Sequence, residues 1–235
     1  MTAVAQPAGG QSGVRPGAVW RHVVGAVLIV LGASVGVGWV MRLVGGRGPM
    51  GPDRAVTDWF VARRSSGLTD ALRVAQPTGR GWVLLVIGVI GVGLLLLRRH
   101  RRTGGFLVVA MLGAELIVDV AKVVVGRHRP PVALHLEAIG NGAFPSGHAF
   151  NTTVVVGALL VALWHIRARA IPWWGWALVA LVPLVVGLTR VYLGVHWITD
   201  VIAGWFLGAL WVLLLARAFF PTPAIRMTPR VTREP

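Results

Sequence analysis

The stretch "PSGH", residues 145–148, combines groups that could bind an anion and move a proton. Pro145 and Ser146 are well suited to begin a helix, whose first turn offers unpaired N–H groups and the positive end of the helix dipole. Gly147 leaves room for an anion to approach that backbone. His148 follows, and an imidazole gives or takes a proton near neutral pH. Taken alone, the stretch fits a histidine that caps or packs more often than a catalytic one.

A second histidine lies in "TRVYLGVHWITD", residues 189–200. His196 and Asp200 are four residues apart, so they share one face of a predicted helix. A carboxylate at this spacing can hold one imidazole nitrogen and leave the other basic, which makes the ring a nucleophile. Arg190 precedes the turn. The alternative is a buried polar network between two helices, which explains Asp200 but not a histidine directed at cations.

Two cations lie in a third stretch, "KVVVGRHRP", residues 122–130. A helix that ends near Gly126 and continues as an extended Arg129-Pro130 segment would direct Lys122 and Arg129 to one point. Arginine presents a planar fork and lysine a compact charge, and both suit a phosphate. The alternative for Lys122 is a structural ion pair with Asp119, three residues earlier.

The composition indicates the class of protein that carries these stretches. The chain has 235 residues, of which 55% are hydrophobic and 13% charged, and its mean hydropathy is +0.72. Soluble domains carry about 25% charged residues, so this is a membrane protein. The net charge of +15 comes from arginines in loops and at helix ends, as at 97–102, 165–170 and 226–234. Such arginines set topology and meet anionic headgroups, so no nucleic-acid partner is expected. The absence of cysteine excludes disulfides, thiolate metal sites and cysteine nucleophiles.

The sequence predicts an all-α, polytopic membrane protein that forms a single domain over 19–220, with disordered tails at 1–18 and 221–235. Between spans one and two, apolar residues at 56, 59, 60 and 68 fall near helical spacing. This pattern favours short amphipathic surface helices, and a solvated connector is an equally compatible alternative. Apolar runs long enough for six transmembrane helices lie near 23–44, 81–97, 104–126, 146–166, 173–190 and 198–219.

The basic clusters predict the orientation. If they are cytoplasmic, both termini of this multi-pass plasma-membrane protein are cytoplasmic too. The ends of spans three and five and the starts of spans four and six then share the extracytoplasmic face. We therefore expect an active site on that face, formed by Lys122, Arg129, Ser146, Gly147, His148, Arg190, His196 and Asp200.

In this order and spacing, the three stretches resemble the signature of the type 2 phosphatidic acid phosphatase family. These are integral-membrane lipid phosphate phosphatases whose active-site pattern is shared with vanadium haloperoxidases and bacterial class A acid phosphatases. The resemblance covers roughly residues 50–220, and its specific part lies between 122 and 200. One departure is Thr189, where the family usually has serine, and the hydroxyl is kept.

The resemblance implies a role for each of these residues. His196 would attack phosphorus and become a phosphohistidine, oriented by Asp200, and His148 would protonate the leaving oxygen and then activate water. The remaining five would bind the phosphate oxygens, Gly147 through its amide. No metal or other cofactor is expected, and Arg127 and His135 are assigned no role. The phosphate-binding set is Lys122, Arg129, Ser146, Gly147 and Arg190.

The predicted function is therefore hydrolysis of a phosphomonoester or diphosphate of a membrane lipid. Phosphatidate, phosphatidylglycerol phosphate and undecaprenyl diphosphate are the substrates implied by the resemblance, and the three stretches, which would contact only phosphate, do not choose among them. Two alternatives stay open: a lipid phosphotransferase of the same fold and a non-enzymatic lipid-binding or transport protein. The sequence does not specify an oligomeric state.

Overall fold

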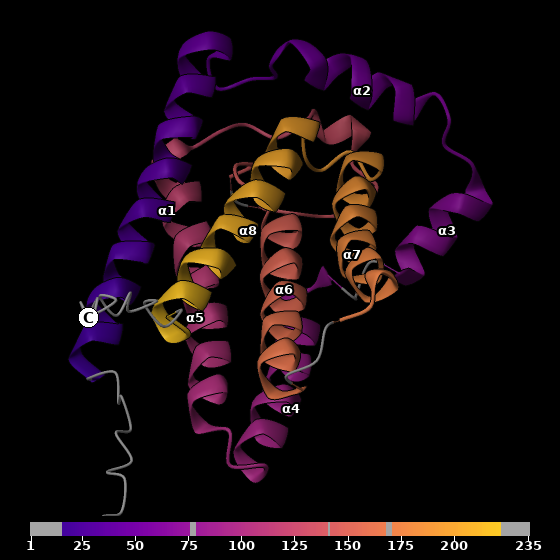
Figure 1. The fold of residues 1–235 in the computed structure, drawn as a ribbon. Helices are drawn as coiled ribbons and strands as arrows, with labels where there is room; N and C mark the ends of the chain where they lie inside the picture. Colours follow the sequence, from indigo (N-terminus) through magenta and orange to yellow (C-terminus); the bar gives the residue numbers. More distant parts are fainter. Residues whose placement is uncertain (1–15, 76–78, 141, 168–170, 222–235) are drawn as a thin grey trace, which may run out of the picture.

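The computed structural model describes residues 16–75, 79–140, 142–167 and 171–221, and every regular element in these ranges is a helix. The long helices run side by side, α2 crosses one end of the bundle, and α3 lies at its side (Figure 1). Their bounds match the predicted apolar runs to within a few residues, except that α1 starts earlier. The long helices are α1 (Pro16–Gly45), α4 (Gly81–Leu97), α5 (Arg101–Val125), α6 (Gly147–Arg167), α7 (Trp173–Tyr192) and α8 (Ile198–Phe219).

Helix α6 lies in the middle of the bundle and contacts α4, α5, α7 and α8. The core around it is apolar and includes Phe106, Phe150 and Trp211, each fully buried. The indole N–H of Trp211 donates to the Ala110 carbonyl at 2.9 Å, so its one polar group is satisfied. Close packing of α8 on α5 depends on Gly113, because a Cβ there would lie 2.3 Å from the Trp211 ring.

The outward faces of the bundle are apolar, as a lipid environment requires. Leu112 and Phe206, for example, are 68% and 74% exposed. By length and composition, α1 (from Val19), α6, α7 and α8 could each cross a membrane. Helix α4 is apolar but has only 17 residues, and α5 carries Glu115, Asp119 and Lys122. The described residues therefore contain four candidate spans, and the count of six stays a prediction.

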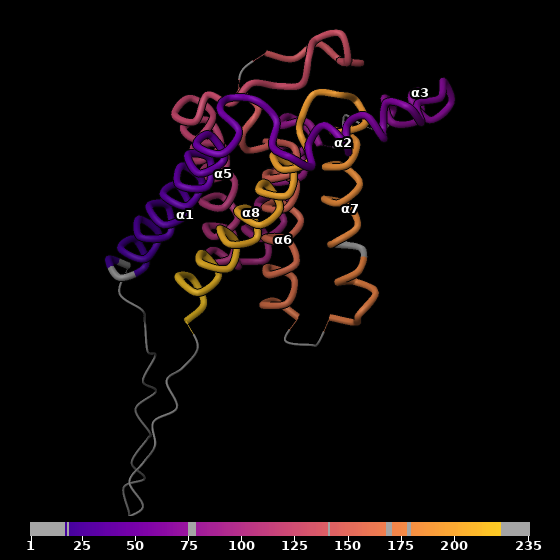
Figure 2. The backbone as a smooth tube through the Cα atoms, turned by 90° about the horizontal axis from the view of Figure 1, so that it is seen from above, coloured from indigo at the N-terminus to yellow at the C-terminus, as the bar shows by residue number. Residues whose placement is uncertain are grey.

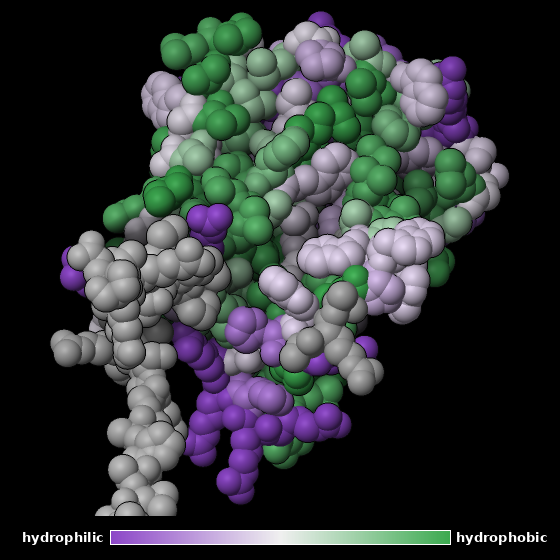
Figure 3. All heavy atoms as spheres, in the orientation of Figure 1, coloured by the Kyte–Doolittle hydropathy of each residue, from purple (hydrophilic) through white to green (hydrophobic). Residues whose placement is uncertain are grey.

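A dense cluster of exposed basic residues lies at one end of the bundle. The turn from α4 to α5 carries Arg98, Arg99, Arg101 and Arg102, all exposed, and Figure 3 shows the hydrophilic surface at this end. The segment from the end of α1 to the start of α4 also carries exposed arginines, at 47, 54, 63, 73 and 80. The end of the bundle opposite the α4–α5 turn holds a further concentration of polar side chains, which is buried.

The segment between α1 and α4 forms two short helices, α2 (Gly51–Val61) and α3 (Ser66–Ala75). The predicted helices are present; α3 is exposed over 66–74 apart from Thr69 and Leu72, whereas α2 is anchored on the bundle. Helix α2 lies beside the end of α7 and the start of α8 (Figure 2). Its inward face packs Val56 and Phe60 against Val191 and Val201, and it also buries Asp53 and Thr57. Because α2 buries both apolar and polar side chains, it is packed against the ends of α7 and α8 as a fixed part of the fold.

The structure tests the predicted disordered tails only in part. Helix α1 begins at Pro16, so residues 16–18 are helical. Residues 1–15 and 222–235 lie outside the described residues, and the predicted disorder there stays a prediction.

Candidate active site

Four helix ends and one loop meet at the end of the bundle that α2 crosses. Helix α5 ends at Gly126, which has φ 58° and donates its N–H to the Lys122 carbonyl at 3.0 Å, as the sequence predicted. Helix α6 begins directly after Ser146, and α8 approaches it closely because residue 204 is glycine: a Cβ there would lie 2.9 Å from the Ser146 carbonyl. Seven of the eight predicted site residues lie on these ends or in the loop between α5 and α6, and His196 lies in the turn between α7 and α8.

The His196 ring is oriented between an anion and a cation. Its Nδ1 lies 3.6 Å from Oδ2 of Asp200, and both side chains are buried. Its Nε2 lies 3.0 Å from Nη1 of Arg129. A guanidinium can only donate, so Nε2 accepts and the ring proton belongs on Nδ1, which faces Asp200 at 3.6 Å without a hydrogen bond. Burial, followed by the charges of Arg129, Arg190 and Lys122, holds the pKa of His196 well below its usual range. A neutral imidazole with its lone pair on Nε2 is competent as a nucleophile.

Arg129 ties the loop after α5 to the turn between α7 and α8. Its Nη2 donates to the Gly142 carbonyl at 3.2 Å, and its Nη1 also donates to the Val195 carbonyl. Burial lowers the pKa of Arg129 to about 10, so the side chain stays charged at neutral pH. A fixed positive charge therefore lies directly beside the Nε2 atom of His196.

Several buried polar atoms around His196 have no partner among the described residues. Arg190 is 1% exposed and donates from Nη2 to Glu137 at 2.8 Å, but its Nε and Nη1 donate to nothing. Ser146 Oγ and His148 Nε2 are likewise unpartnered. Unpaired buried donors cost about 1–3 kcal/mol each. Their concentration at one place indicates a site for a ligand rich in acceptors.

Lys122 completes the cation set. Its Nζ lies 3.4 Å from the position that a Cβ on Gly147 would occupy, so the ammonium faces the first turn of α6. The space that this glycine leaves is the space an anion would need. Within the described part of the chain, no ion pair joins Lys122 to Asp119, so that alternative is wrong.

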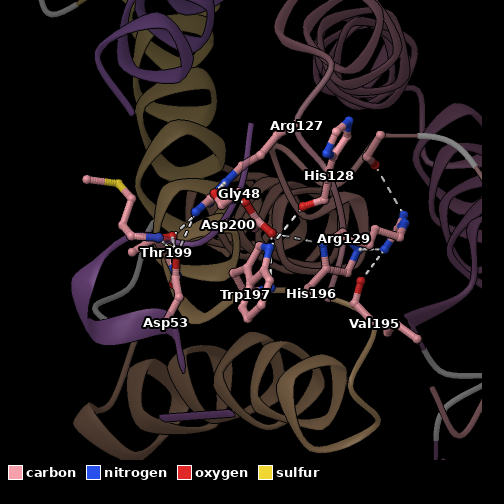
Figure 4. Close-up of polar contacts among 12 residues, drawn as sticks. Gly48, Asp53, Arg127, His128, Arg129, Val195, His196, Trp197, Thr199 and Asp200 are labelled. Atoms are coloured by element: carbon pink, nitrogen blue, oxygen red, sulfur yellow. Dashed lines mark hydrogen bonds and ion pairs between the residues drawn. The ribbon is translucent and has the colours of Figure 1, made fainter. Parts of the chain in front are cut away.

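Sequence reasoning missed a part of the network that reaches α2. Arg127 was assigned no role, yet its guanidinium is buried and binds Asp200 at 2.5 Å and Asp53 at 2.6 Å (Figure 4). Arg127 thus contacts the carboxylate that faces His196, which its sequence neighbourhood did not indicate. His135 makes a bond within its own loop, to the Pro130 carbonyl. Asp53 had one available signal: an acidic residue in the first turn of an amphipathic helix.

The comparisons with known proteins show the family to which the chain belongs. The model of the PAP2 superfamily matches residues 103–223, just over half of the 235-residue chain. The chain belongs to the PAP2 superfamily. An undecaprenyl-diphosphatase of Sulfolobus acidocaldarius is 30% identical over 181 residues, covering 75% of this chain and 82% of that protein. Phosphatidylglycerophosphatase B of Bacillus subtilis is 29% identical over 172 residues, covering 69% and 81%.

A solved structure shares the fold. The crystal structure of a transmembrane PAP2 type phosphatidylglycerolphosphate phosphatase from Bacillus subtilis matches with a TM-score of 0.61 at 26% identity. The match covers 83% of this chain and 94% of that one. The predicted family is thereby confirmed, and the chain is a multi-pass membrane phosphatase of that superfamily.

Proposed function

We propose that this phosphatase releases phosphate from a lipid monophosphate or diphosphate at the outer face of the plasma membrane, through a phosphohistidine on His196. One observation carries the proposal. Unpartnered atoms of Ser146, His148 and Arg190 and the charges of Lys122 and Arg129 surround a buried, neutral His196. A tetrahedral phosphate offers the acceptors and negative charge that this arrangement lacks.

The chemistry proceeds in two displacements. Nε2 of His196 attacks phosphorus, forming a P–N bond as the P–O bond to the lipid breaks, and protonated His148 gives its proton to the leaving oxygen. Water then attacks the phosphohistidine as His148 takes its proton, and the P–N bond breaks to release phosphate. As the imidazole gains positive charge in the first step, Asp200 stabilises the proton on Nδ1.

The phosphate oxygens are held by groups that cannot themselves react. Lys122, Arg129 and Arg190 supply charge, and Ser146 and the amide of Gly147 supply hydrogen bonds. Arg190 already shares one nitrogen with Glu137. A bound phosphate would take the two nitrogens that remain.

The lipid chain has a place to lie beside this site. A cavity of about 250 Å³ lies between α4, α5 and α6, with Leu85 and Leu112 among its lining residues. These leucines are exposed, so the cavity borders the lipid-facing surface. Asn151, also in its lining, is one helical turn beyond His148. The chain of a substrate could therefore leave the site directly into the bilayer.

We further propose six spans with both termini cytoplasmic. Helices α4 and α5 run between the same two ends of the bundle as α6, α7 and α8, which supports counting them as spans (Figure 1). Placing the exposed arginines of the α4–α5 turn in the cytoplasm follows the positive-inside rule. The site, at the opposite end, then faces outward.

Purified protein in detergent tests the function. Phosphate release is measured, with EDTA present, from phosphatidate, phosphatidylglycerol phosphate and undecaprenyl diphosphate, for the wild type, His196→Ala and the control His22→Ala. His22 is exposed on α1. We expect metal-independent release from at least one lipid, abolished only in His196→Ala. Transfer of phosphate to an acceptor lipid in place of release would identify a phosphotransferase. Neither reaction, or release unaffected by losing His196, would overturn the proposal.

A further inference from the structure

A chain of buried charges extends from His196 to α2. Asp200, Arg127 and Asp53 follow one another with side chains that are 0%, 3% and 0% exposed. Figure 4 shows Arg127 between the two carboxylates, with Thr199 beside Asp53. Burying three charges is costly unless each is paired and hydrogen-bonded, so such an arrangement calls for an explanation.

Every polar atom of Arg127 and Asp53 is satisfied. Arg127 Nε donates to the Gly48 carbonyl at 3.3 Å, and its Nη1 also donates to Thr199 Oγ1 at 2.8 Å. Asp53 accepts from the amides of Met50 at 2.7 Å and Thr199 at 3.1 Å. The guanidinium is therefore fixed in one orientation by four neighbours, and no bond to it can be lost without leaving a buried group unpaired.

Arg127 binds only one oxygen of Asp200. Its Nη1 lies 2.5 Å from Oδ1, whereas Oδ2 accepts from the Trp197 amide at 3.0 Å and faces Nδ1 of His196. The carboxylate plane is therefore set from the side opposite to the imidazole. A guanidinium with no second anion would be free to pair both nitrogens with Asp200, in the bidentate geometry that arginine favours.

We propose that Asp53 and Arg127 are positioning residues for the nucleophile: Asp53 holds one arm of Arg127, so that Arg127 fixes Asp200 by one oxygen and leaves the other for His196. The inference rests on the proposed function of His196. It concerns a residue that the family match does not reach, since Asp53 precedes residue 103.

The charges of the network support this assignment. Two carboxylates and one guanidinium sum to one negative charge, and this charge lies next to the imidazole that becomes positive when it is phosphorylated. With Asp53 neutral, the sum would be zero, and the phosphohistidine would lose its counter-charge in a buried site. Asp53 thus acts through Arg127 and Asp200 and touches no reacting atom.

A purely structural role predicts a different outcome. Asp53 also accepts from the Thr199 amide in the first turn of α8, so it could serve only to fix that helix start. A structural defect would weaken phosphate binding, phosphorylation of His196 and thermal stability together. Loss of positioning would slow phosphorylation and leave phosphate binding intact, because no phosphate-binding group contacts Asp53.

The test compares Asp53→Asn with Asp58→Asn, a control on the exposed side of the same helix. Rapid-quench measurements give the rate of phosphohistidine formation on the lipid that the wild type hydrolyses, and inhibition by inorganic phosphate gives the affinity of the site. We expect Asp53→Asn to slow phosphorylation about 10- to 100-fold, as when partners of metal-ligating histidines are removed. The phosphate inhibition constant should change less than about twofold, and Asp58→Asn should match the wild type.

Two further variants keep the inference testable if Asp53→Asn folds poorly. Thr199→Val removes one bridging hydroxyl and should slow phosphorylation in the same direction by a smaller factor. In a protein that already carries Asp200→Asn, adding Asp53→Asn should leave the rate of phosphorylation almost unchanged, since the carboxylate that Asp53 supports is already lost.

The possible failures are distinguishable. A wild type that forms no phosphohistidine contradicts the proposed function, and the inference falls with it. A normal phosphorylation rate in Asp53→Asn, or a parallel loss of phosphate affinity and melting temperature in both Asp53→Asn and Thr199→Val, overturns the inference alone.

Discussion

Residues 103–223 and the preceding part of the chain contribute to the site in different ways. The C-terminal part, which the family model matches, supplies all eight residues to which we assign contact with the phosphate or the reacting histidine. The N-terminal part supplies none of them. We assign it a closing role beside the site, from the contacts of Asp53 with Arg127 and of Arg64 with the carbonyls of Leu134 and Tyr192. The residues assigned to the chemistry can thus be read from motifs, whereas the buried contact of Arg127 with Asp53 comes from a helix that carries no motif.

Among the residues that bind phosphate, the largest effect should come from the charged ones. Arg190→Lys keeps the charge but loses the planar fork with its two unpartnered nitrogens. We expect kcat/KM for lipid phosphate to fall about 100- to 1,000-fold, as when one donor to a developing oxyanion is removed. Arg217→Lys is the matched control, because Arg217 is exposed at the end of α8 that lies away from the site. A loss below about threefold in Arg190→Lys would remove Arg190 from the site.

A smaller effect separates binding from folding within the C-terminal part. Ser146 is fully buried and its hydroxyl has no partner, so Ser146→Ala should leave the melting temperature unchanged. It should lower kcat/KM about 10- to 100-fold through one lost bond to a charged ligand. In the control Ser34→Ala, which loses a bond to the Val30 carbonyl, activity should be normal. Equal activity in the two variants would show that Ser146 binds no phosphate.

Substitutions in the N-terminal part should lower the melting temperature more than they lower activity. Arg64 donates to the Tyr192 carbonyl at 3.0 and 2.7 Å and to the Leu134 carbonyl at 2.9 Å. Arg64→Ala removes these bonds and should lower the melting temperature by several degrees, with activity reduced only about threefold. Arg63→Ala is the control, because the Arg63 guanidinium stacks on the exposed Trp59. A melting temperature unchanged by Arg64→Ala would contradict a closing role for this segment.

The smallest expected effect is on the pH dependence of stability. The pKa of His196 is lowered in the folded protein by burial, so the unfolded chain binds more protons below its ordinary pKa. Stability should therefore fall as the pH drops through about 6.5, by roughly 1 kcal/mol at pH 5.5 for this group. Thermal unfolding of the wild type and His196→Gln at pH 7.5 and 5.5 measures this difference. An equal pH response in the two proteins would mean that His196 titrates normally.

The sequence predicted the site residues in the C-terminal part but not the residue that the N-terminal part adds. His148, His196, Asp200 and the three cations were found because each lies in a short stretch whose spacing has a direct chemical meaning. The pair of Arg127 and Asp53 was not found because the two residues are 74 positions apart, and no local pattern connects an acidic residue on a surface helix to a loop arginine. Only the packing of α2 across the ends of α7 and α8 brings them together.

The span count shows a related limit. Apolar runs predicted six helices at the observed places, yet α5 carries acidic and basic residues in its second half. Composition cannot distinguish a span that carries an active site from a helix that lies outside the membrane. The shared ends of α4, α5 and α6 are a property of the fold, and they support the larger count.

Direct observation of the covalent intermediate tests the central claim. The wild type is mixed with a lipid phosphate labelled with ³²P, quenched within milliseconds in alkali, in which phosphohistidine is stable, and digested for mass spectrometry. We expect the label on Nε2 of His196, the atom turned away from Asp200. The protein should be labelled at least as fast as phosphate is released. Phosphate release with no labelled histidine, or label on His148, would contradict the account.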